Sequence, residues 1–265
     1  MTRDYEEYLK DDNLHINWYP GHMKKTKEMV QNNLKLVDVV IELLDARIPL
    51  SSKNPEIDKL AQNKPRVVVL NKSDLSDKAK LNKWISYYQS KGIKAIPVDT
   101  LKGNGVNKIV EECKNATKEK MDALKEKGRK ERAIRVMIVG VPNVGKSSLI
   151  NKLTGRKSTQ TGDRPGVTKG KQWVRLKGNL ELLDTPGILW PKFEDQKIAL
   201  NLAFTRAIKD EILDIDTLGL KFIEKMSEIE PEKLKARYKL DSLGEEPLET
   251  MEMIGRKRGF ILGRN

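Results

Sequence analysis

The stretch "VMIVGVPNVGKSSL", residues 136–149, decides the fold class of this 265-residue chain. A β-branched apolar run leads into Gly140 to Ser147, which match the pattern G-x-x-x-x-G-K-[ST], and helix-forming residues follow. This strand, glycine-rich turn and helix are the context that a phosphate-binding loop (P-loop) requires, because backbone N–H groups and the helix N-terminus converge on an anion. We therefore expect Lys146 to reach the β and γ phosphates of a nucleotide and Ser147 to bind Mg²⁺.

A second motif, "VVVLNKSDL" at residues 67–75, lies well before the P-loop in the chain. An apolar strand pattern ends here in Asn71-Lys72-Ser73-Asp74, a sequence that seldom arises by chance at such a place. The carboxylate of Asp74 can accept hydrogen bonds from the ring N–H and the exocyclic amine of guanine, a pair that adenine lacks. A buried Asp74 would be left unpaired by adenine, which favours GTP over ATP. We expect Asn71 to tie this loop to the P-loop and the stem of Lys72 to cover the base.

A third motif, Asp184-Thr-Pro-Gly187, ends the strand pattern "LELLDT" at residues 180–185. An acidic residue in this place can hold Mg²⁺ directly or through water, and the Gly187 N–H can meet the γ-phosphate. Asp-x-x-Gly alone usually marks a turn, but its distance after the P-loop supports the functional reading. Between the two motifs lies "TGDRPGVTKG", residues 161–170, in which Thr168 is expected to close on Mg²⁺ when a γ-phosphate is present.

All parts of a guanine-nucleotide site are thus present, but the base-reading motif precedes the P-loop. A sheet fold is defined by the spatial order of its strands, so joining the old termini and cutting elsewhere preserves the site. We therefore predict a circularly permuted site for GTP or GDP, with Mg²⁺ bound by Ser147, Thr168 and Asp184. The tip "VDTLKG", residues 98–103, is expected to give a backbone N–H to the guanine carbonyl. The residues predicted to bind the nucleotide are Asn71, Lys72, Asp74, Asp99, Thr100, Pro142, Asn143, Val144, Gly145, Lys146, Ser147, Ser148 and Gly187.

Apolar strand patterns alternate with helical patterns over the first 190 residues, which implies a mostly parallel sheet covered on both faces. The expected strands are 37–46, 65–72, 93–100 and 136–140, with a hairpin formed by 170–176 and 180–185. The expected helices are 22–36, 77–92, 105–128 and 146–155. Later segments have helical spacing only, at 196–213, 220–229, 231–240 and 246–259. We predict an α/β fold with a circularly permuted P-loop GTPase domain in residues 1–190 and a small all-α domain in residues 191–265.

The charge balance is strongly basic, with 51 Lys and Arg against 38 Asp and Glu, a net charge of +13 and a pI near 9.5. Scattered lysines can simply solvate a surface, but a pI this high favours a polyanionic partner. Four Phe and six Tyr supply few stacking platforms, which favours a reader of folded RNA over a single-strand groove. We expect the C-terminal helices to contribute, including the basic run Arg256-Lys257-Arg258, although that run could instead interact only with its own helix end.

The cellular setting predicted from the sequence is the cytoplasm. No apolar stretch approaches the ~20 residues that a membrane span needs, and the N-terminus lacks the apolar core of a secretory signal. Cys113 is the single cysteine, so neither an internal disulfide nor a multi-cysteine zinc site can form.

Taken together, the motifs resemble those of the ribosome biogenesis GTPase A (RbgA/YlqF) family of circularly permuted GTPases. The resemblance spans residues 14 to about 260, and it implies a bacterial GTPase that matures the large ribosomal subunit by binding its precursor and rRNA. Other permuted GTPases usually carry zinc-binding cysteines or an OB domain. Family members continue beyond the final "GFILGRN", so we expect the RNA-facing end to be incomplete. The matching segments are "WYPGHMKKT", "LLDARIPLSSKNP", "LNKSDL", "GVPNVGKSSLINKL", "RPGVTKG" and "LLDTPGILWPK".

The group that orients the attacking water is not evident from the motifs, because Ile188 stands where Ras-like enzymes place a glutamine. The resemblance points to His22 of the "PGHM" segment, although a histidine after Pro-Gly is more often a turn residue. Asn143 is a second candidate, since an asparagine at this place helps bind K⁺ in several related GTPases. Arg47 could act as an arginine finger or form a strand-end ion pair. With His22, the expected catalytic residues are Lys146, Thr168 and Gly187.

The favoured function is a GTPase that binds the large-subunit precursor, leaves on hydrolysis and is monomeric off the ribosome. The alternative is a GTP-dependent RNA-binding adaptor whose hydrolysis is incidental, which Ile188 keeps open. The sequence gives no support for a metabolic P-loop kinase, because it shows no motif for a second substrate pocket or a lid. Asn71-Lys72-x-Asp74 also argues for a G protein.

Overall fold

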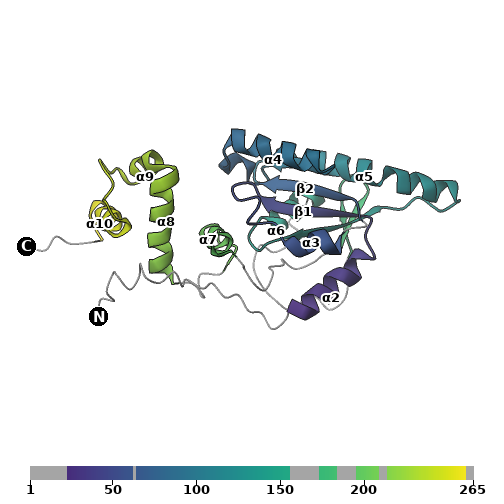
Figure 1. Ribbon diagram of the computed structural model, residues 1–265. Coiled ribbons are helices and arrows are strands. Elements are labelled where there is room, and N and C mark those ends of the chain that lie inside the picture. Colours follow the sequence, from purple (N-terminus) through teal and green to yellow (C-terminus); the bar gives the residue numbers. More distant parts are fainter. Residues whose placement is uncertain (1–22, 62–63, 156–172, 184–194, 209–213, 261–265) are drawn as a thin grey trace, which may run out of the picture. The chain divides into compact units, whose positions relative to one another are not determined.

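A computed structural model describes residues 23–61, 64–155, 173–183, 195–208 and 214–260 of the chain (Figure 1). The chain divides into two compact units, with the boundary between Ile198 and Ala199. The boundary expected from the sequence, between residues 190 and 191, lies outside the described residues.

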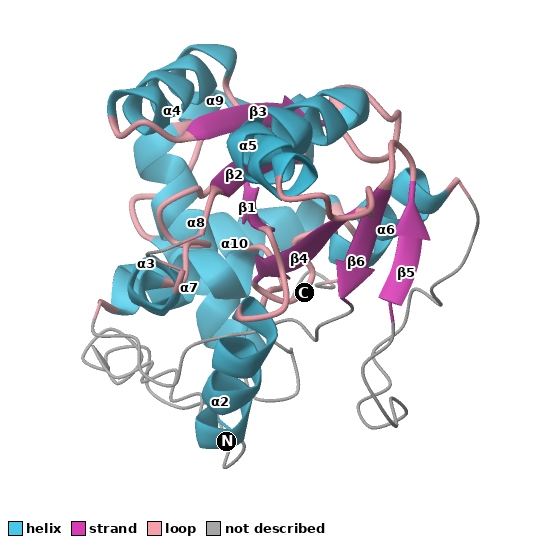
Figure 2. Cartoon of the chain, turned by 90° about the vertical axis from the view of Figure 1, so that its right-hand side faces the viewer, coloured by secondary structure: helices cyan, strands magenta, loops and turns pink. Residues whose placement is uncertain are grey.

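The first unit is built on a six-stranded sheet in the order β3-β2-β1-β4-β6-β5 (Figure 2). Every neighbouring pair is parallel except β5 and β6, which are antiparallel, so the predicted mostly parallel sheet and its terminal hairpin are confirmed. Gly178 and Asn179 turn this hairpin with φ of 73° and 63°, a backbone region that these two residue types tolerate. The strands are β1 (Val39–Asp45), β2 (Arg66–Asn71), β3 (Lys94–Val98), β4 (Ile134–Gly140), β5 (Trp173–Leu176) and β6 (Leu180–Leu183).

Helices cover both faces of this sheet. Successive side chains of a strand point to opposite faces, and on β1 Val40 packs with α2 and α3 while Leu44 packs with α4. Ile41 and Leu43 therefore face the other side, where α5 and α6 lie against the central strands. The helices are α2 (Met23–Leu34), α3 (Pro55–Leu60), α4 (Lys78–Ser90), α5 (Val106–Glu126) and α6 (Lys146–Thr154), with a 3-10 turn η1 (Ser73–Leu75).

Buried Asp38 secures the connection from α5 to β4, which joins the base-reading half of the chain to the P-loop half. Its carboxylate accepts hydrogen bonds from Lys120 Nζ at 2.6 Å, Arg132 NH1 at 2.7 Å and the Arg135 amide at 2.9 Å. Burial opposes the charge of Asp38, but these donors outweigh burial and hold its pKa well below the ordinary value. The connector is thereby fixed to the amino end of β1.

Glu42 is a buried carboxyl group in the middle of β1, with a residue exposure of 2%. It lies between Val40 and Leu44, at the seam of the two apolar clusters on that face. Arg66 NH1 is 3.3 Å from Glu42 Oε2, but neither carboxylate oxygen has a hydrogen-bond partner in the described part of the chain. Burial raises the pKa of Glu42 from 4.5 to about 7, although the charge of Arg66 opposes the shift. The fold therefore favours the protonated acid.

Glu42→Gln is expected to raise the stability of this unit at alkaline pH. Because the folded-state pKa is raised, the stability contribution of protonated Glu42 is fully present below pH 4.5 and is lost as the pH rises through about 7. Glutamine stays neutral, so the variant should gain about 2–3 kcal/mol in the free energy of unfolding near pH 8.5 and change little near pH 5. Urea unfolding followed by tryptophan fluorescence at both pH values measures the difference.

The matched control is Glu126→Gln, an exposed glutamate in the last turn of α5. It should change stability by less than about 0.5 kcal/mol at either pH. An equal effect of Glu42→Gln at the two pH values would show that Glu42 does not titrate between them.

The described part of the second unit is helical, as the sequence predicts. Pro231 opens α9 at its first helical position, where its missing N–H costs nothing, and Asp214 caps α8 by accepting from the amides of Asp216 and Thr217. No helix in the described ranges of either unit is long and apolar enough to cross a membrane. The helices are α7 (Gln196–Phe204), which spans the boundary between the units, α8 (Ile215–Ile229), α9 (Pro231–Tyr238) and α10 (Pro247–Lys257).

Two helices differ from expectation. The sequence pattern predicts one helix over 196–213, but α7 ends at Phe204 and Arg206 follows with φ of 62°. Thr205 Oγ1 donates to the carbonyls of Asn201 and Leu202, which satisfies acceptors of the last turn and helps to end the helix. The second difference is α3, which the sequence analysis did not predict because six residues are too few to show a period.

Candidate nucleotide-binding site

The predicted nucleotide-binding loops follow the carboxyl ends of neighbouring parallel strands. The strand register places Asn71 of β2 beside Asp45 of β1 and Val98 of β3. On the other side of β1, Gly140 at the end of β4 pairs with Leu43. Ligands of open α/β sheets bind at this edge. The base-reading motif thus comes before the P-loop in the chain, but the strands that carry the two motifs end at the same edge of the sheet.

The P-loop begins where β4 ends and closes on the first turn of α6. Asn143 and Gly145 have φ of 55° and 104°, a left-handed region that suits glycine and that asparagine tolerates. A Cβ on Gly145 would overlap the Asn71 side-chain amide, and a Cβ on Gly140 would lie 2.6 Å from Leu43 O. Both glycines are therefore required by close packing. The half-buried residues Lys146, Ser147 and Ser148 form the first turn of the helix, where orphan N–H groups favour an anion.

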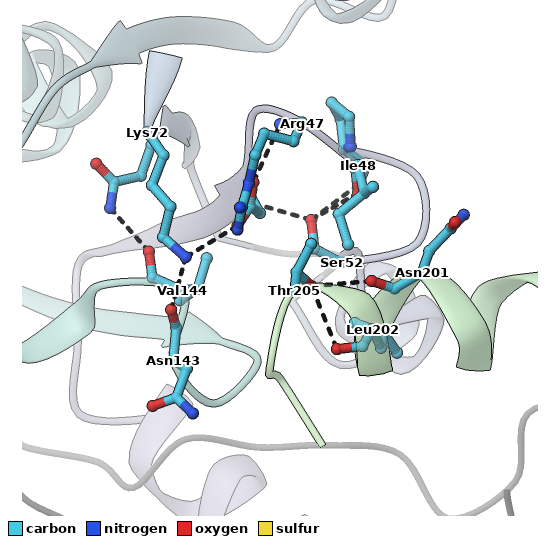
Figure 3. A network of polar contacts seen from close by, with 12 residues as sticks. Arg47, Ile48, Ser52, Lys72, Asn143, Val144, Asn201, Leu202 and Thr205 are labelled. Carbon is cyan, nitrogen blue, oxygen red and sulfur yellow. Dashed lines mark hydrogen bonds and ion pairs between the residues drawn. The ribbon is translucent and has the colours of Figure 1, made fainter. Parts of the chain in front are cut away.

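Two successive residues of the base-reading motif hold two successive carbonyls of the P-loop (Figure 3). The buried Asn71 Nδ2 donates to Val144 O at 2.8 Å, as the sequence analysis expected of Asn71. Lys72, in a left-handed conformation with φ of 60°, donates from Nζ to Asn143 O at 2.8 Å. These bonds fix the two loops relative to each other although they are more than 70 residues apart in the chain.

Two polar groups of the base-reading motif remain available to a ligand. Asn71 Oδ1 is buried and has no hydrogen-bond partner among the residues that the structure describes. Asp74 lies on η1 and is exposed, whereas the sequence argument treated it as buried. If Asp74 binds guanine as predicted, the base would have to exclude water from it. An exposed carboxylate is an acceptor of the kind that the ring N–H and the exocyclic amine of guanine need.

The loop after β3 is shaped by the Asp99 side chain. Asp99 Oδ1 accepts from the amides of Leu101 and Lys102 at 3.0 and 3.1 Å, and the loop is closed by a bridge to Asn104. The hydroxyl of Thr100 lies 3.8 Å from the position of a Cβ built on Gly145. Asp99 therefore positions the loop, and Thr100 brings it to the P-loop.

A residue that the sequence analysis missed, Asp45, bonds to both Arg47 and Lys72, two of the residues labelled in Figure 3. Its side chain is 3% exposed, and it accepts from Arg47 Nε at 2.8 Å, Arg47 NH2 at 2.6 Å and Lys72 Nζ at 3.0 Å. Burial opposes its charge, but the hydrogen bond from Arg47 and the charge of Lys72 outweigh burial and lower the pKa of Asp45. Of the two readings of Arg47, the structure shows the strand-end ion pair.

Four residues of the predicted site lie outside the described residues: His22, Thr168, Asp184 and Gly187. Ile188, which stands where Ras-like enzymes place a glutamine, also lies outside them. Strand β6 runs parallel to β4 and is described to Leu183, so it points toward the same edge as the P-loop strand. Within the described ranges no group of three or more His, Cys, Asp and Glu could hold a metal ion. The roles assigned to these residues stay predictions.

Fold and site together define the class. A mostly parallel sheet carries a P-loop on a central strand, and a base-reading motif placed earlier in the chain is bonded to that loop. The protein is a circularly permuted P-loop GTPase. Residues 135–246 match the model of a family described as "50S ribosome-binding GTPase".

Comparison with known proteins narrows the class to one family. Ribosome biogenesis GTPase A of Bacillus cereus is 50% identical over 248 residues, which cover 94% of this chain and 84% of that protein. The protein of the same name from Priestia megaterium is 49% identical over 249 residues, covering 94% and 86%. The crystal structure of GNP-bound YlqF from T. maritima is 28% identical with a TM-score of 0.59, covering 90% of this chain and 85% of that one. The chain belongs to the ribosome biogenesis GTPase A family, and it is a GTP hydrolase.

Proposed function

We propose that this GTPase binds the immature large ribosomal subunit through its rRNA and is released when GTP is hydrolysed. The observation that supports the GTP-dependent part of the proposal is the pair of bonds from Asn71 and Lys72 to consecutive P-loop carbonyls, which joins the predicted base and phosphate loops. The names of the relatives, and the description of a family that binds the 50S ribosome, supply the partner. The net charge of +13 suits rRNA.

Within the site, each predicted residue has a distinct part. Lys146 contacts the β and γ phosphates, and Ser147 binds Mg²⁺, which neutralises charge on the phosphates when bound. Thr168 and Asp184 complete the metal site, and the Gly187 N–H meets the γ-phosphate. Asp74 reads the base, and Asn71 ties the base loop to the P-loop.

The attacking water needs a positioning group, because the side chain of Ile188 cannot hydrogen-bond. His22 supplies that group by holding water through a ring nitrogen near neutral pH. The alternative to His22 is Asn143, which would support catalysis by helping to bind K⁺. His22 would take up its catalytic position only on the ribosome, which couples hydrolysis to binding.

A second candidate function rests on Ile188 as well. If no group replaces the missing amide, hydrolysis is incidental and the protein is a GTP-dependent RNA-binding adaptor. In either case we place it in the cytoplasm as a monomer off the ribosome.

The exposed basic run at the end of α10 is the proposed contact with rRNA. Its ion pairs are loose: Arg256 NH2 is 3.5 Å from Glu252 and Lys257 Nζ is 3.7 Å from Asp241. Arg258 stacks over the Tyr238 ring at 5.6 Å. Such cations can exchange their partners for phosphates at little cost.

Co-sedimentation with immature large subunits tests the proposal. We expect the protein to pellet with these particles in a GTP analogue that cannot be hydrolysed and to remain in the supernatant in GDP. Binding should fall steeply as salt rises, because basic side chains release counterions from rRNA. Glutamate at Arg256, Lys257 and Arg258 together should weaken pelleting and leave GTP binding intact.

Mature large subunits are the matched control and should bind less. Equal pelleting in the GTP analogue and in GDP would contradict release on hydrolysis. Loss of GTP binding in the triple variant would show that it is misfolded, and the salt dependence of the wild type would then carry the RNA assignment.

A further inference from the structure

Asp45 forms ion pairs with two positively charged side chains, Arg47 and Lys72, beside the base-reading motif. The same oxygen, Oδ2, contacts Arg47 NH2 at 2.6 Å and Lys72 Nζ at 3.0 Å, so the two positive groups lie side by side. Oδ1 accepts from the Arg47 amide at 3.0 Å and from Arg47 Nε at 2.8 Å. The carboxylate is thus saturated, and removing it would leave two neighbouring cations without their shared counter-charge.

Hydrogen bonds hold the backbone on both sides of Arg47. Asp45 N donates to Ser52 Oγ at 3.0 Å, and Ser52 Oγ in turn donates to Ile48 O at 3.0 Å. The next amide, of Ala46, donates to Asn71 O at 2.8 Å and joins the loop to the end of β2. Arg47 is therefore held at the same edge as the base-reading motif.

Asp74, the proposed base reader, lies two residues after Lys72, which shares Asp45 Oδ2 with Arg47. The pKa of Arg47 is raised, first by its hydrogen bond to Asp45 and also by the charges of Asp45 and Asp74. Asp74 is exposed, and the side chain of Arg47 is 30% exposed, so both side chains reach solvent. A guanidinium freed from Asp45 has in Asp74 a planar carboxylate of the kind that arginine binds with two hydrogen bonds.

We propose that Asp45 is a specificity-determining positioning residue: it holds Arg47 away from Asp74 and so reserves Asp74 for the guanine base. Through the same carboxylate Asp45 keeps Lys72 bonded to the P-loop carbonyl of Asn143. The inference rests on the proposed role of Asp74 as the base reader. It gives Asp45 and Arg47 a role in nucleotide selection rather than in catalysis.

A simpler structural role for Asp45 makes a different prediction. If Asp45 acts only by tethering Lys72, its removal loosens the base loop and weakens every purine nucleotide that fits the site by the same factor. If Asp45 keeps Arg47 off Asp74, its removal weakens the hydrogen bonds that Asp74 makes. Comparing GTP with ITP isolates the contribution of the hydrogen bonds to Asp74, because inosine lacks the exocyclic amine of guanine and has one donor fewer for Asp74.

The test is the binding of GTP and ITP to four proteins, measured by calorimetric titration in Mg²⁺: wild type, Asp45→Asn, Arg47→Ala and the double variant. Asp45→Asn should weaken GTP by about tenfold and lower the GTP-over-ITP preference by about fivefold, the scale of one lost hydrogen bond. The double variant should recover the preference, because the competing arginine is gone. Asp58→Asn is the matched control, since Asp58 on α3 also bridges a lysine and an arginine, Lys53 and Arg66.

The outcomes of these titrations distinguish the inference from its alternatives. Equal loss of GTP and ITP in Asp45→Asn, no loss at all, or no recovery in the double variant overturns the inference. A wild-type protein without preference for GTP over ITP would instead refute the base-reading role of Asp74. An equal change in Asp58→Asn would attribute the effect to general destabilisation and would also overturn the inference.

Discussion

Asp74→Asn is expected to lower the affinity for GTP by about 10²- to 10³-fold and to let xanthosine triphosphate bind better than GTP. The carboxylate accepts two hydrogen bonds from guanine, and the amide presents a donor to one of those donors. Xanthine carries a carbonyl where guanine has its amine, so the same amide can donate to it. The loss combines a missing charge-assisted bond with a donor left facing a donor.

Titration of wild type and variant with GTP and xanthosine triphosphate measures the exchange. Asp77→Asn is a suitable control, because Asp77 caps α4 only three residues further along the chain. Capping is worth about 1 kcal/mol of helix stability, so this control should leave nucleotide preference unchanged. GTP affinity in Asp74→Asn within twofold of the wild type would remove Asp74 from the site.

The parts of the fold that could be read from the sequence are those with a strong local pattern. Strands β1, β2 and β4 are near-continuous apolar runs, as expected of strands buried on both faces. Helix α3 was missed because its signal is a single cap, Asn54 followed by Pro55, rather than a period. The early end of α7 was missed because the apolar spacing continues beyond Phe204.

In the nucleotide site, too, the sequence revealed the residues that belong to a contiguous motif and missed those that depend on the fold. The P-loop and Asn71-Lys72-x-Asp74 are contiguous, so their residue types and spacing reveal them. Asp45 depends on strand register, which brings it beside a motif 27 residues away. Its only trace in sequence is an acid at the end of an apolar run with an arginine two positions on. Glu42 was equally hidden, because its environment is set by two packed clusters.

The second large effect concerns the rate of GTP hydrolysis on the ribosome. The Ile188 side chain cannot orient water, so the free protein should turn over slowly. Binding to an immature large subunit should bring His22 into place and accelerate hydrolysis by about 10²-fold or more, the scale of one positioned catalytic group. His22→Ala should remove that acceleration while keeping GTP affinity within about twofold, a change of only ~0.4 kcal/mol.

Two comparisons define the cause of the acceleration. Lys146→Ala is the inactive reference, because it removes the charge facing the β and γ phosphates. Replacing K⁺ by Na⁺ tests the contribution of Asn143, and a fall in rate that persists in His22→Ala would assign catalysis to the bound cation. Equal losses in free and ribosome-bound His22→Ala would mean that His22 is in place without RNA.

The coupling of hydrolysis to the large-subunit precursor is tested most directly by single-turnover hydrolysis of GTP by the wild-type protein, alone and with immature large subunits, in K⁺. The account predicts that the precursor raises the rate by about 10²-fold and that mature subunits do so much less. The same rate with and without the precursor would contradict it and would leave the protein a GTP-dependent RNA-binding adaptor.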